Sequence, residues 1–282
     1  MKNKRWFGLF SFLEYNGAMI TFVISFFILG LIVGSFLNVL VFRLRDAETL
    51  LGRSFCRSCK NPIRWYDNIP LISFALLRGL CRDCEKKISW QYPLVELLTG
   101  VAFALTGYFF FSESSMLSWL ETAWLLGILS CLIVIAAYDL KYMEVPLNML
   151  IISALLIYVF LVAYFVLAPE PFFVSRLWYG FLGGAIVAGF FFLLVFWSRE
   201  KWMGWGDVWL GFVSGSVVGA PLILPLLTLS FGLGAIAGLL AIVYGGKSLK
   251  SQIAFAPFLV GGTIATLFLE RTFPSLFHFF IL

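Results

Sequence analysis

Runs of about 20 apolar residues recur along most of this chain, and they limit its possible folds more than any other feature. A helix needs about 20 such residues to cross the hydrocarbon core of a bilayer. Of the 282 residues, 61% are hydrophobic and only 12% are charged, which excludes an ordinary soluble domain. The sequence therefore predicts an all-α, polytopic membrane protein. We expect about eight transmembrane helices, at residues 18–42, 93–111, 118–138, 147–168, 178–197, 207–222, 224–244 and 254–273.

The distribution of Lys and Arg among the loops predicts the orientation of these helices. Cytoplasmic loops of membrane proteins carry an excess of both residues. Here most basic residues fall within residues 43–92, 139–146, 198–206 and 245–253. We therefore expect these loops in the cytoplasm and both termini on the opposite side. The net charge of +5 reflects this bias. No motif indicates binding to nucleic acid, whereas membrane lipids are expected partners.

The first apolar run is expected to remain in the protein. It is long and lacks a small-residue cleavage site, which favours a membrane span over a removed signal peptide. The aromatic-rich residues 1–17 are expected to form an interfacial anchor. We therefore divide the chain into residues 1–42, the lead-in and first helix, residues 43–92, a cytoplasmic loop, and residues 93–282, the core of remaining helices.

The cytoplasmic loop contains four cysteines in two pairs. Cys56 and Cys59 form one Cys-x-x-Cys motif, Cys81 and Cys84 form another, and 21 residues separate the two. Four thiolates at such spacing suit a tetrahedral, structural Zn2+ site that resembles a zinc ribbon. Two disulfides are the alternative, which a reducing cytosol disfavours. Cys131 lies alone in an apolar run and is expected to be a packing residue.

Three further features of the first 100 residues each have two interpretations. Asn38, near the end of the first span, either hydrogen-bonds to another helix or contacts a ligand. Glu96, one turn inside the helix that Pro93 begins, either interacts with the helix dipole or contacts a substrate. Residues 61–70, between the cysteine pairs, form either a binding surface or a β-hairpin on the membrane surface.

Two aspartates are the candidate catalytic residues. Asp207 follows Gly204-Trp205-Gly206 and begins an apolar run, whereas Asp139 ends an earlier one. Ionised groups at membrane depth are costly and therefore indicate function, and flanking glycines let a substrate backbone approach closely. Each aspartate alone could simply face lipid headgroups. However, the expected topology places both at the cytoplasmic face at similar depth, where two carboxylates can share acid/base chemistry.

Other functional classes fit the residues less well. The only histidine, His278, is expected at the outer end of the last helix, so no Ser-His-Asp or Cys-His arrangement is available. A proton- or ion-coupled transporter would need carboxylates near the midplane and an internal repeat, and the chain has neither feature. A non-catalytic scaffold with a zinc-ribbon loop would explain the cysteines but not the aspartates.

Taken in order, these elements resemble the bacterial type IV prepilin peptidases, which are aspartic proteases of the GxGD class. The resemblance covers nearly the whole chain. It rests on Gly34-Ser35-Phe36-Leu37-Asn38-Val39, the paired cysteine motifs with residues 61–70 between them, Tyr92-Pro93-Leu94-Val95-Glu96-Leu97, Asp139 with Pro146 downstream, Gly204-Trp205-Gly206-Asp207-Val208, and Ala256-Pro257-Phe258-Leu259. Trp205 and Trp209 depart from the family pattern, where a smaller residue and a lysine are common. In the family an Asp or Asn more often follows this proline directly, whereas here Asn148 stands two residues after Pro146.

The resemblance implies a function at the bacterial inner membrane. Members of the family remove basic leader peptides from prepilins and pseudopilins at the cytoplasmic face, cutting after a glycine. The family's catalytic aspartates correspond to Asp139 and Asp207, and Gly204, Gly206, Glu96 and Asn38 are expected to support the substrate or nearby loops. Many members also methylate the new N-terminal amine with S-adenosylmethionine. No glycine-rich cofactor loop is visible here, so that second activity rests on the resemblance alone.

Overall fold

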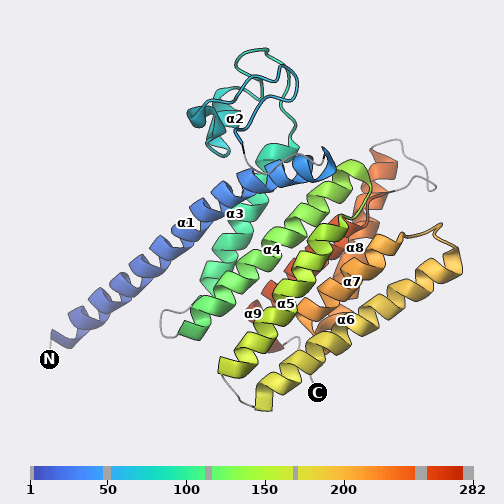
Figure 1. Cartoon of the computed structure of the whole chain (residues 1–282). Helices are drawn as coiled ribbons and strands as arrows, with labels where there is room; N and C mark the ends of the chain where they lie inside the picture. Colours follow the sequence, from blue (N-terminus) through green and yellow to red (C-terminus); the bar gives the residue numbers. More distant parts are fainter. Residues whose placement is uncertain (1–2, 47–51, 112–115, 168–170, 245–252, 276–282) are drawn as a thin grey trace. The chain divides into compact units, whose positions relative to one another are not determined.

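The computed structural model describes residues 3–46, 52–111, 116–167, 171–244 and 253–275. His278 and most of the basic segment 245–253 lie outside these ranges. The described residues are mostly helical and contain no strand, and residues 52–90 hold most of the non-helical part. The helices, coloured along the chain in Figure 1, are α1 (Asn3–Asp46), α2 (Ile72–Leu76), α3 (Gln91–Phe109), α4 (Met116–Tyr142), α5 (Leu147–Leu167), α6 (Pro171–Ser198), α7 (Trp205–Val218), α8 (Ile223–Val243) and α9 (Ala256–Thr272). Two short 3-10 helices, η1 (Trp65–Asn68) and η2 (Ala220–Leu222), complete the set.

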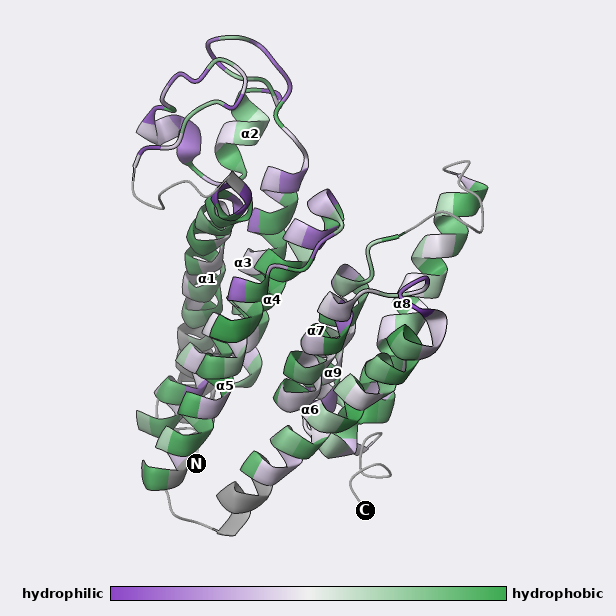
Figure 2. Cartoon of the chain, turned by 45° about the vertical axis from the view of Figure 1, so that its right-hand side comes forward, coloured by the Kyte–Doolittle hydropathy of each residue, from purple (hydrophilic) through white to green (hydrophobic). Residues whose placement is uncertain are grey.

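Six helical stretches among the described residues are long and apolar enough to cross a membrane. They are Met19–Arg45, Gln91–Phe109, Met116–Tyr142, Leu147–Tyr164, Leu177–Ser198 and Ala220–Val243. Figure 2 shows hydrophobic residues along these helices and hydrophilic ones in the loop around α2. The prediction of a polytopic helical membrane protein is therefore confirmed.

Two of the expected spans, 207–222 and 254–273, are shorter in the structure. They correspond to α7 with 14 residues and α9 with 17 residues, fewer than the roughly 20 that usually cross a bilayer. α7 stops early because Gly219 adopts a left-handed conformation, with φ of 81°, and Pro221 follows. This combination ends helices because glycine tolerates positive φ and proline cannot continue the helix.

The chain forms two compact units, residues 1–43 with 47–126 and residues 44–46 with 127–282. In the first unit, α1 and α3 lie side by side in close backbone contact (Figure 1). A Cβ atom on Gly30 would lie 2.7 Å from Cα of Gly100, and one on Gly34 would lie 2.8 Å from Cα of Glu96. The two glycines of α1 are four residues apart and share one helix face. Small residues at this spacing let membrane helices approach closely.

Substituting Gly34 by alanine is expected to destabilise this helix pair. The new methyl group would overlap the backbone of α3, and overpacking of this kind costs about 1–3 kcal/mol. Gly189→Ala in α6 is the matched control, because a Cβ there meets no atom within 4 Å. Thermal unfolding in detergent should show a lower midpoint for Gly34→Ala than for the wild type. The midpoint of Gly189→Ala should not decrease. Equal midpoints would contradict the close contact of α1 and α3.

In the second unit, α7 is held by its neighbours on several sides. Its backbone contacts that of α6, because a Cβ on Gly183 would lie 2.5 Å from the carbonyl oxygen of Gly215. The hydroxyl groups of Tyr158 and Ser216 lie 3.1 Å apart and link α5 to α7. Leu210 of α7 is fully buried. The start of α7, which carries Asp207, is therefore fixed by a densely packed helix.

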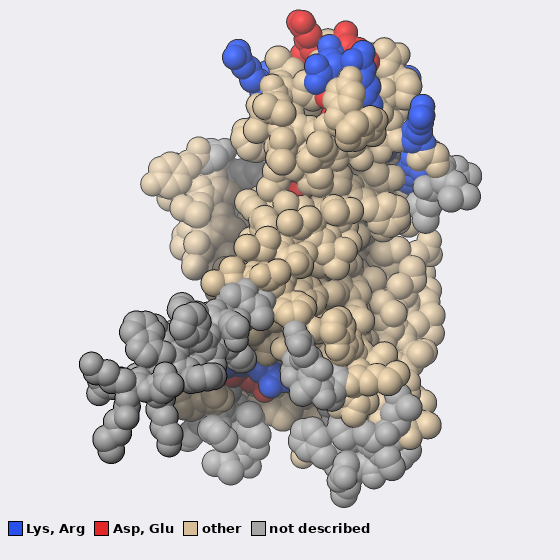
Figure 3. Space-filling model, turned by 90° about the vertical axis from the view of Figure 1, so that its left-hand side faces the viewer, with Lys and Arg blue, Asp and Glu red and all other residues tan. Residues whose placement is uncertain are grey.

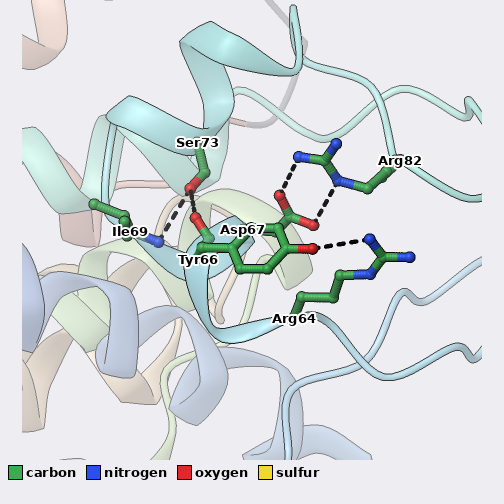
Figure 4. Close-up of polar contacts among 6 residues, drawn as sticks. All are labelled: Arg64, Tyr66, Asp67, Ile69, Ser73 and Arg82. Carbon is green, nitrogen blue, oxygen red and sulfur yellow. Dashed lines mark hydrogen bonds and ion pairs between the residues drawn. The ribbon is translucent and has the colours of Figure 1, made fainter.

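Residues 61–70 do not form a β-hairpin, so that alternative is wrong. The segment contains η1, and α2 follows directly. Side-chain bonds favour this compact turn over a hairpin (Figure 4). The Ser73 hydroxyl donates to the carbonyl of Tyr66 at 2.8 Å and accepts from the backbone N–H of Ile69 at 3.1 Å. The only β-bridges in the described part of the loop are two isolated pairs, Phe55 with Pro62 and Leu80 with Lys87.

An ion pair supports the same turn. The Arg82 guanidinium donates to both carboxylate oxygens of Asp67, at 2.6 and 2.8 Å (Figure 4). These hydrogen bonds hold the pKa of Asp67 below its usual value. A carboxylate with a lowered pKa contributes stability above its unfolded pKa of about 3.9. That contribution is lost as the pH falls through the lowered value.

Candidate active site

Asp139 lies in the last turn of α4 and is bonded to the beginning of α9. The residue is 5% exposed, and its Oδ2 accepts a hydrogen bond of 3.0 Å from the backbone N–H of Ala256. The first N–H groups of a helix have no partner within the helix, so they favour a carboxylate at this position. α4 ends shortly afterwards at Tyr142, and the next residue, Met143, has a φ of 58°.

Asp207 lies in the first turn of α7, three residues after the N-cap Gly204. Its Oδ2 accepts a hydrogen bond of 3.2 Å from the backbone N–H of Gly204. A carboxylate at this position commonly bonds back to the N-cap. The preceding turn is fastened by Trp205, whose indole N–H donates to Oε1 of Glu200 at 2.8 Å. The Gly204-Trp205-Gly206 segment therefore presents Asp207 in a defined conformation.

The two glycines of this segment have different surroundings. A Cβ on Gly206 would lie 2.8 Å from Cβ of Val145, so only glycine fits without a shift of one backbone. A Cβ on Gly204 would meet no atom nearer than 4.0 Å. Val145 belongs to the short connection between α4 and α5 that follows Asp139. Gly206 therefore allows the end of α4 and the start of α7 to touch.

The structure thereby brings Asp139 and Asp207 together, although 67 residues separate them in the sequence (207 − 139 − 1). The two carboxyl groups are close enough to interact electrostatically, and the interaction is repulsive when both are ionised. Each uses Oδ2 for a backbone N–H, and neither Oδ1 has a hydrogen-bond partner among the described residues. Two carboxyl groups in one site can offer one acid and one base to a substrate.

Asn38 and Glu96 lie in the other unit. The amide of Asn38 is fully buried, and Nδ2 donates to the carbonyl of Tyr92 at 3.1 Å. Glu96 is 7% exposed, and its carboxylate accepts a hydrogen bond of 2.9 Å from the backbone N–H of Leu71. Asn38 therefore joins α1 to α3, and Glu96 joins α3 to the loop before α2. These hydrogen bonds give Asn38 and Glu96 a structural role, and none of them involves the two aspartates.

The four paired cysteines converge in the loop. Sγ atoms of Cys56, Cys59, Cys81 and Cys84 all lie within 4.8 Å of one another. Cys56 and Cys84 are 3.9 Å apart, close to the roughly 3.8 Å between sulfurs in a tetrahedral site with Zn–S bonds of about 2.3 Å. The cluster can therefore hold a metal ion that thiolates favour.

The two cysteine motifs also share a local conformation. In the first, the N–H of Lys60 donates to the carbonyl of Cys56 at 2.8 Å. In the second, the N–H of Glu85 donates to the carbonyl of Cys81 at 2.9 Å. Both donors have positive φ, 63° and 55°. Two equivalent turns that aim four sulfurs at one point are typical of a metal site.

Sequence reasoning missed two of the residues that shape the aspartate pair. Val145 is an ordinary apolar residue in the sequence, and Glu200 is one charge in a polar turn, so neither carried a signal. Ala256 did carry one, because Ala256-Pro257-Phe258-Leu259 is one of the segments on which the family resemblance rests. The hydrogen bond from the Ala256 N–H to Asp139 shows how this segment contacts the site.

Comparison with known proteins identifies the family of this chain. Residues 28–110 match the family model described as the bacterial peptidase A24 N-terminal domain, and residues 125–239 match the type IV leader peptidase family. A prepilin leader peptidase/N-methyltransferase of Bacillus subtilis is 32% identical over 84% of this chain and 90% of its own length. The chain belongs to the type IV leader peptidase family. This membership favours neither the transporter nor the scaffold alternative.

Other relatives of this family match over a smaller part of their length. Proteins named prepilin leader peptidase/N-methyltransferase from Myxococcus xanthus and Klebsiella pneumoniae are each 38% identical to this chain. The matches cover 45% and 43% of this chain, but only 37% and 53% of those relatives. No solved structure was found that matches the chain.

Proposed function

We propose that this chain is a membrane aspartic endopeptidase that removes basic leader peptides from type IV prepilins and pseudopilins, cutting after a glycine. The convergence of Asp139 and Asp207 from α4 and α7 is the observation that carries this proposal. Family membership supports it, since the relatives are named as prepilin leader peptidases. We place the reaction at the cytoplasmic face of the bacterial inner membrane, because most Lys and Arg fall in the loops expected on that side, among them Lys141 after Asp139 and Arg199 and Lys201 before Asp207.

In the proposed mechanism the two carboxylates act as one acid/base unit. One ionised carboxylate removes a proton from water, and the water attacks the scissile carbonyl carbon. The protonated partner donates a hydrogen bond to the carbonyl oxygen and then transfers its proton to the leaving amine. The backbone N–H groups of Ala256 and Gly204 hold one oxygen of each carboxylate in place, so Oδ1 of each is available to the substrate.

The substrate class follows from the surroundings of the site. The apolar segment of a prepilin would lie among the helices, and its basic leader would remain beside anionic lipid headgroups. Gly204 is exposed and has open space where a side chain would be, which would let an extended substrate backbone come near Asp207. Glu96 and Asn38 would hold the loop and α1 against α3 within the first unit.

A second proposed activity is methylation of the newly formed N-terminal amine with S-adenosylmethionine. The relatives' names, which include N-methyltransferase, support it. We assign no residue of this chain to the methyl donor. Incubation of the cleaved product with labelled S-adenosylmethionine tests this activity separately from cleavage.

We assign the four-cysteine cluster to one structural Zn2+. With four thiolate ligands the metal has no open position, so it stabilises the loop and takes no part in the reaction. Metal analysis of the purified protein is expected to find about one zinc per chain. Cys56→Ser should reduce the zinc content to near zero, whereas Cys131→Ser should leave it unchanged. Full zinc content in Cys56→Ser would contradict the assignment.

The direct test of the peptidase is cleavage of a purified prepilin in detergent. Wild-type protein should release the leader and leave a product that begins directly after the glycine, as mass spectrometry of the new N-terminus would show. No cleavage of any of several prepilins with intact leaders, by folded protein with full zinc content, would overturn the proposal.

A further inference from the structure

α2 exposes an apolar face although it belongs to a charged loop. Ile72 is 57% exposed and Leu76 is 77% exposed. They are four residues apart and therefore share one face of the helix. The neighbouring Ser73 is buried and bonds to the turn before α2 (Figure 4). An exposed apolar face on a helix that is held in place by such bonds commonly marks an interaction surface.

Two contacts fix α2 beside the start of α3. The backbone N–H of Leu71, the residue before α2, donates to the carboxylate of Glu96 at 2.9 Å. The rings of Phe74 and Trp90 pack with centroids 4.9 Å apart. Glu96 is the sixth residue of α3, which by its rise of about 1.5 Å per residue lies roughly 7.5 Å inside that helix.

This position brings the beginning of α2 to the level of a membrane span. Gln91–Phe109 is long and apolar enough to cross a bilayer, and Glu96 lies within its second turn. At the same level Leu94, Leu97 and Leu98 of α3 are exposed, as side chains that face lipid would be. The surface that lipid covers on α3 therefore extends to the depth at which α2 begins.

The rest of the loop suits the headgroup region. Residues 52–90 contain eight Lys or Arg and three Asp or Glu, and the balance stays positive when four thiolates share one Zn2+. In the face drawn in Figure 3, charged side chains gather at the upper end, and the surface beneath them carries few. Trp65 and Trp90 are 81% and 76% exposed. Tryptophan favours the membrane interface, and Lys and Arg favour anionic headgroups.

We propose that the α2 face formed by Ile72 and Leu76 docks into the interface of an anionic phospholipid bilayer, so that the four-cysteine loop lies on the membrane. The occupant is lipid because α2 is bonded at the depth of a membrane span and the loop around it is basic. Docking would hold the four-cysteine loop at a fixed position relative to the bilayer surface. This inference does not depend on the proposed peptidase activity.

Site-specific photo-cross-linking tests the docking. The full-length protein would carry a diazirine amino acid at position 76, in nanodiscs that contain phosphatidylglycerol and phosphatidylcholine. Ser58, exposed between two cysteines of the cluster, is the control position. We expect several-fold more lipid adducts at position 76 than at position 58, measured by mass spectrometry. Equal yields, or adducts at position 76 with a second copy of the chain in place of lipid, would overturn the proposal.

Two further comparisons separate the apolar and electrostatic contributions. Ile72→Asp, with the probe kept at position 76, should reduce the yield of lipid adducts, because a carboxylate on the docking face opposes insertion. Nanodiscs of phosphatidylcholine alone should also reduce it. Unchanged yield with Ile72→Asp would refute docking through this face, and unchanged yield in neutral lipid would refute the preference for anionic lipid. Zinc content, measured in each variant, verifies that the loop is folded.

Discussion

Asp139→Asn and Asp207→Asn are each expected to abolish cleavage of a prepilin while the protein remains folded in the membrane. Asparagine preserves the size of the side chain, and its carbonyl oxygen can still accept the backbone hydrogen bond. It cannot take a proton from water or return one to the leaving amine. Loss of a group that acts as part of a catalytic unit lowers kcat by about 10⁴-fold. The measurement is the initial rate of leader release for each variant.

The same substitutions should not reduce stability. Two nearby carboxylates repel each other when both are ionised, and removal of one relieves that repulsion. We therefore expect thermal midpoints equal to or above that of the wild type. Glu144→Gln is the matched control, because it removes an exposed carboxylate close to Asp139 in the sequence and should cleave at the wild-type rate. If either Asp variant cleaved as fast as Glu144→Gln, the pairing of the two aspartates would be wrong.

Gly206→Ala is expected to cause the next largest loss of activity. Its Cβ would lie 2.8 Å from Cβ of Val145, so the end of α4 and the start of α7 would have to move apart. Overpacking of this kind costs about 1–3 kcal/mol in stability. A displacement of about 1 Å between catalytic groups can reduce the rate by about 100-fold. Both effects are measurable, as a lower thermal midpoint and as slower leader release.

Two other variants identify the cause of that loss. Gly204→Ala should leave the thermal midpoint unchanged, since a Cβ there meets no atom nearer than 4.0 Å. In the double variant Gly206→Ala with Val145→Gly, the space for the new methyl group is restored, and we expect leader release to recover in part. Gly206 would not act through Val145 if leader release did not recover in the double variant and the thermal midpoint of Gly206→Ala equalled that of Gly204→Ala.

The sequence predicted the helical membrane architecture because long apolar runs have few other stable conformations. It also indicated that Asp139 and Asp207 lie on the same side of the membrane, since the order of the spans and the overall Lys/Arg bias place both beside cytoplasmic loops. The cysteine spacing alone was enough to predict the four-sulfur cluster. In each of these cases, the relevant information is local or depends only on the order of the spans.

Packing between distant segments could not be predicted in the same way. The contact of Gly206 with Val145 depends on how α4, α5 and α7 meet, and neither residue type reveals it. α7 is shorter than the apolar run around it because of the left-handed Gly219, which pattern reasoning does not detect within an apolar stretch. Residues 61–70 contain turn formers and aromatic residues that suit a hairpin, but bonds from Ser73 and Arg82 select a 3-10 turn. The division of the chain at residue 92 stays a prediction.

The central claim is that one carboxylate from α4 and one from α7 act on the same peptide bond. An experimental structure with a bound prepilin peptide, in which a hydroxyethylene group replaces the scissile bond, tests this most directly. The account predicts that carboxylate oxygens of both Asp139 and Asp207 lie within about 2.6–3.2 Å of that hydroxyl group. A bound peptide whose hydroxyl group reaches only one of them, or neither, would contradict it.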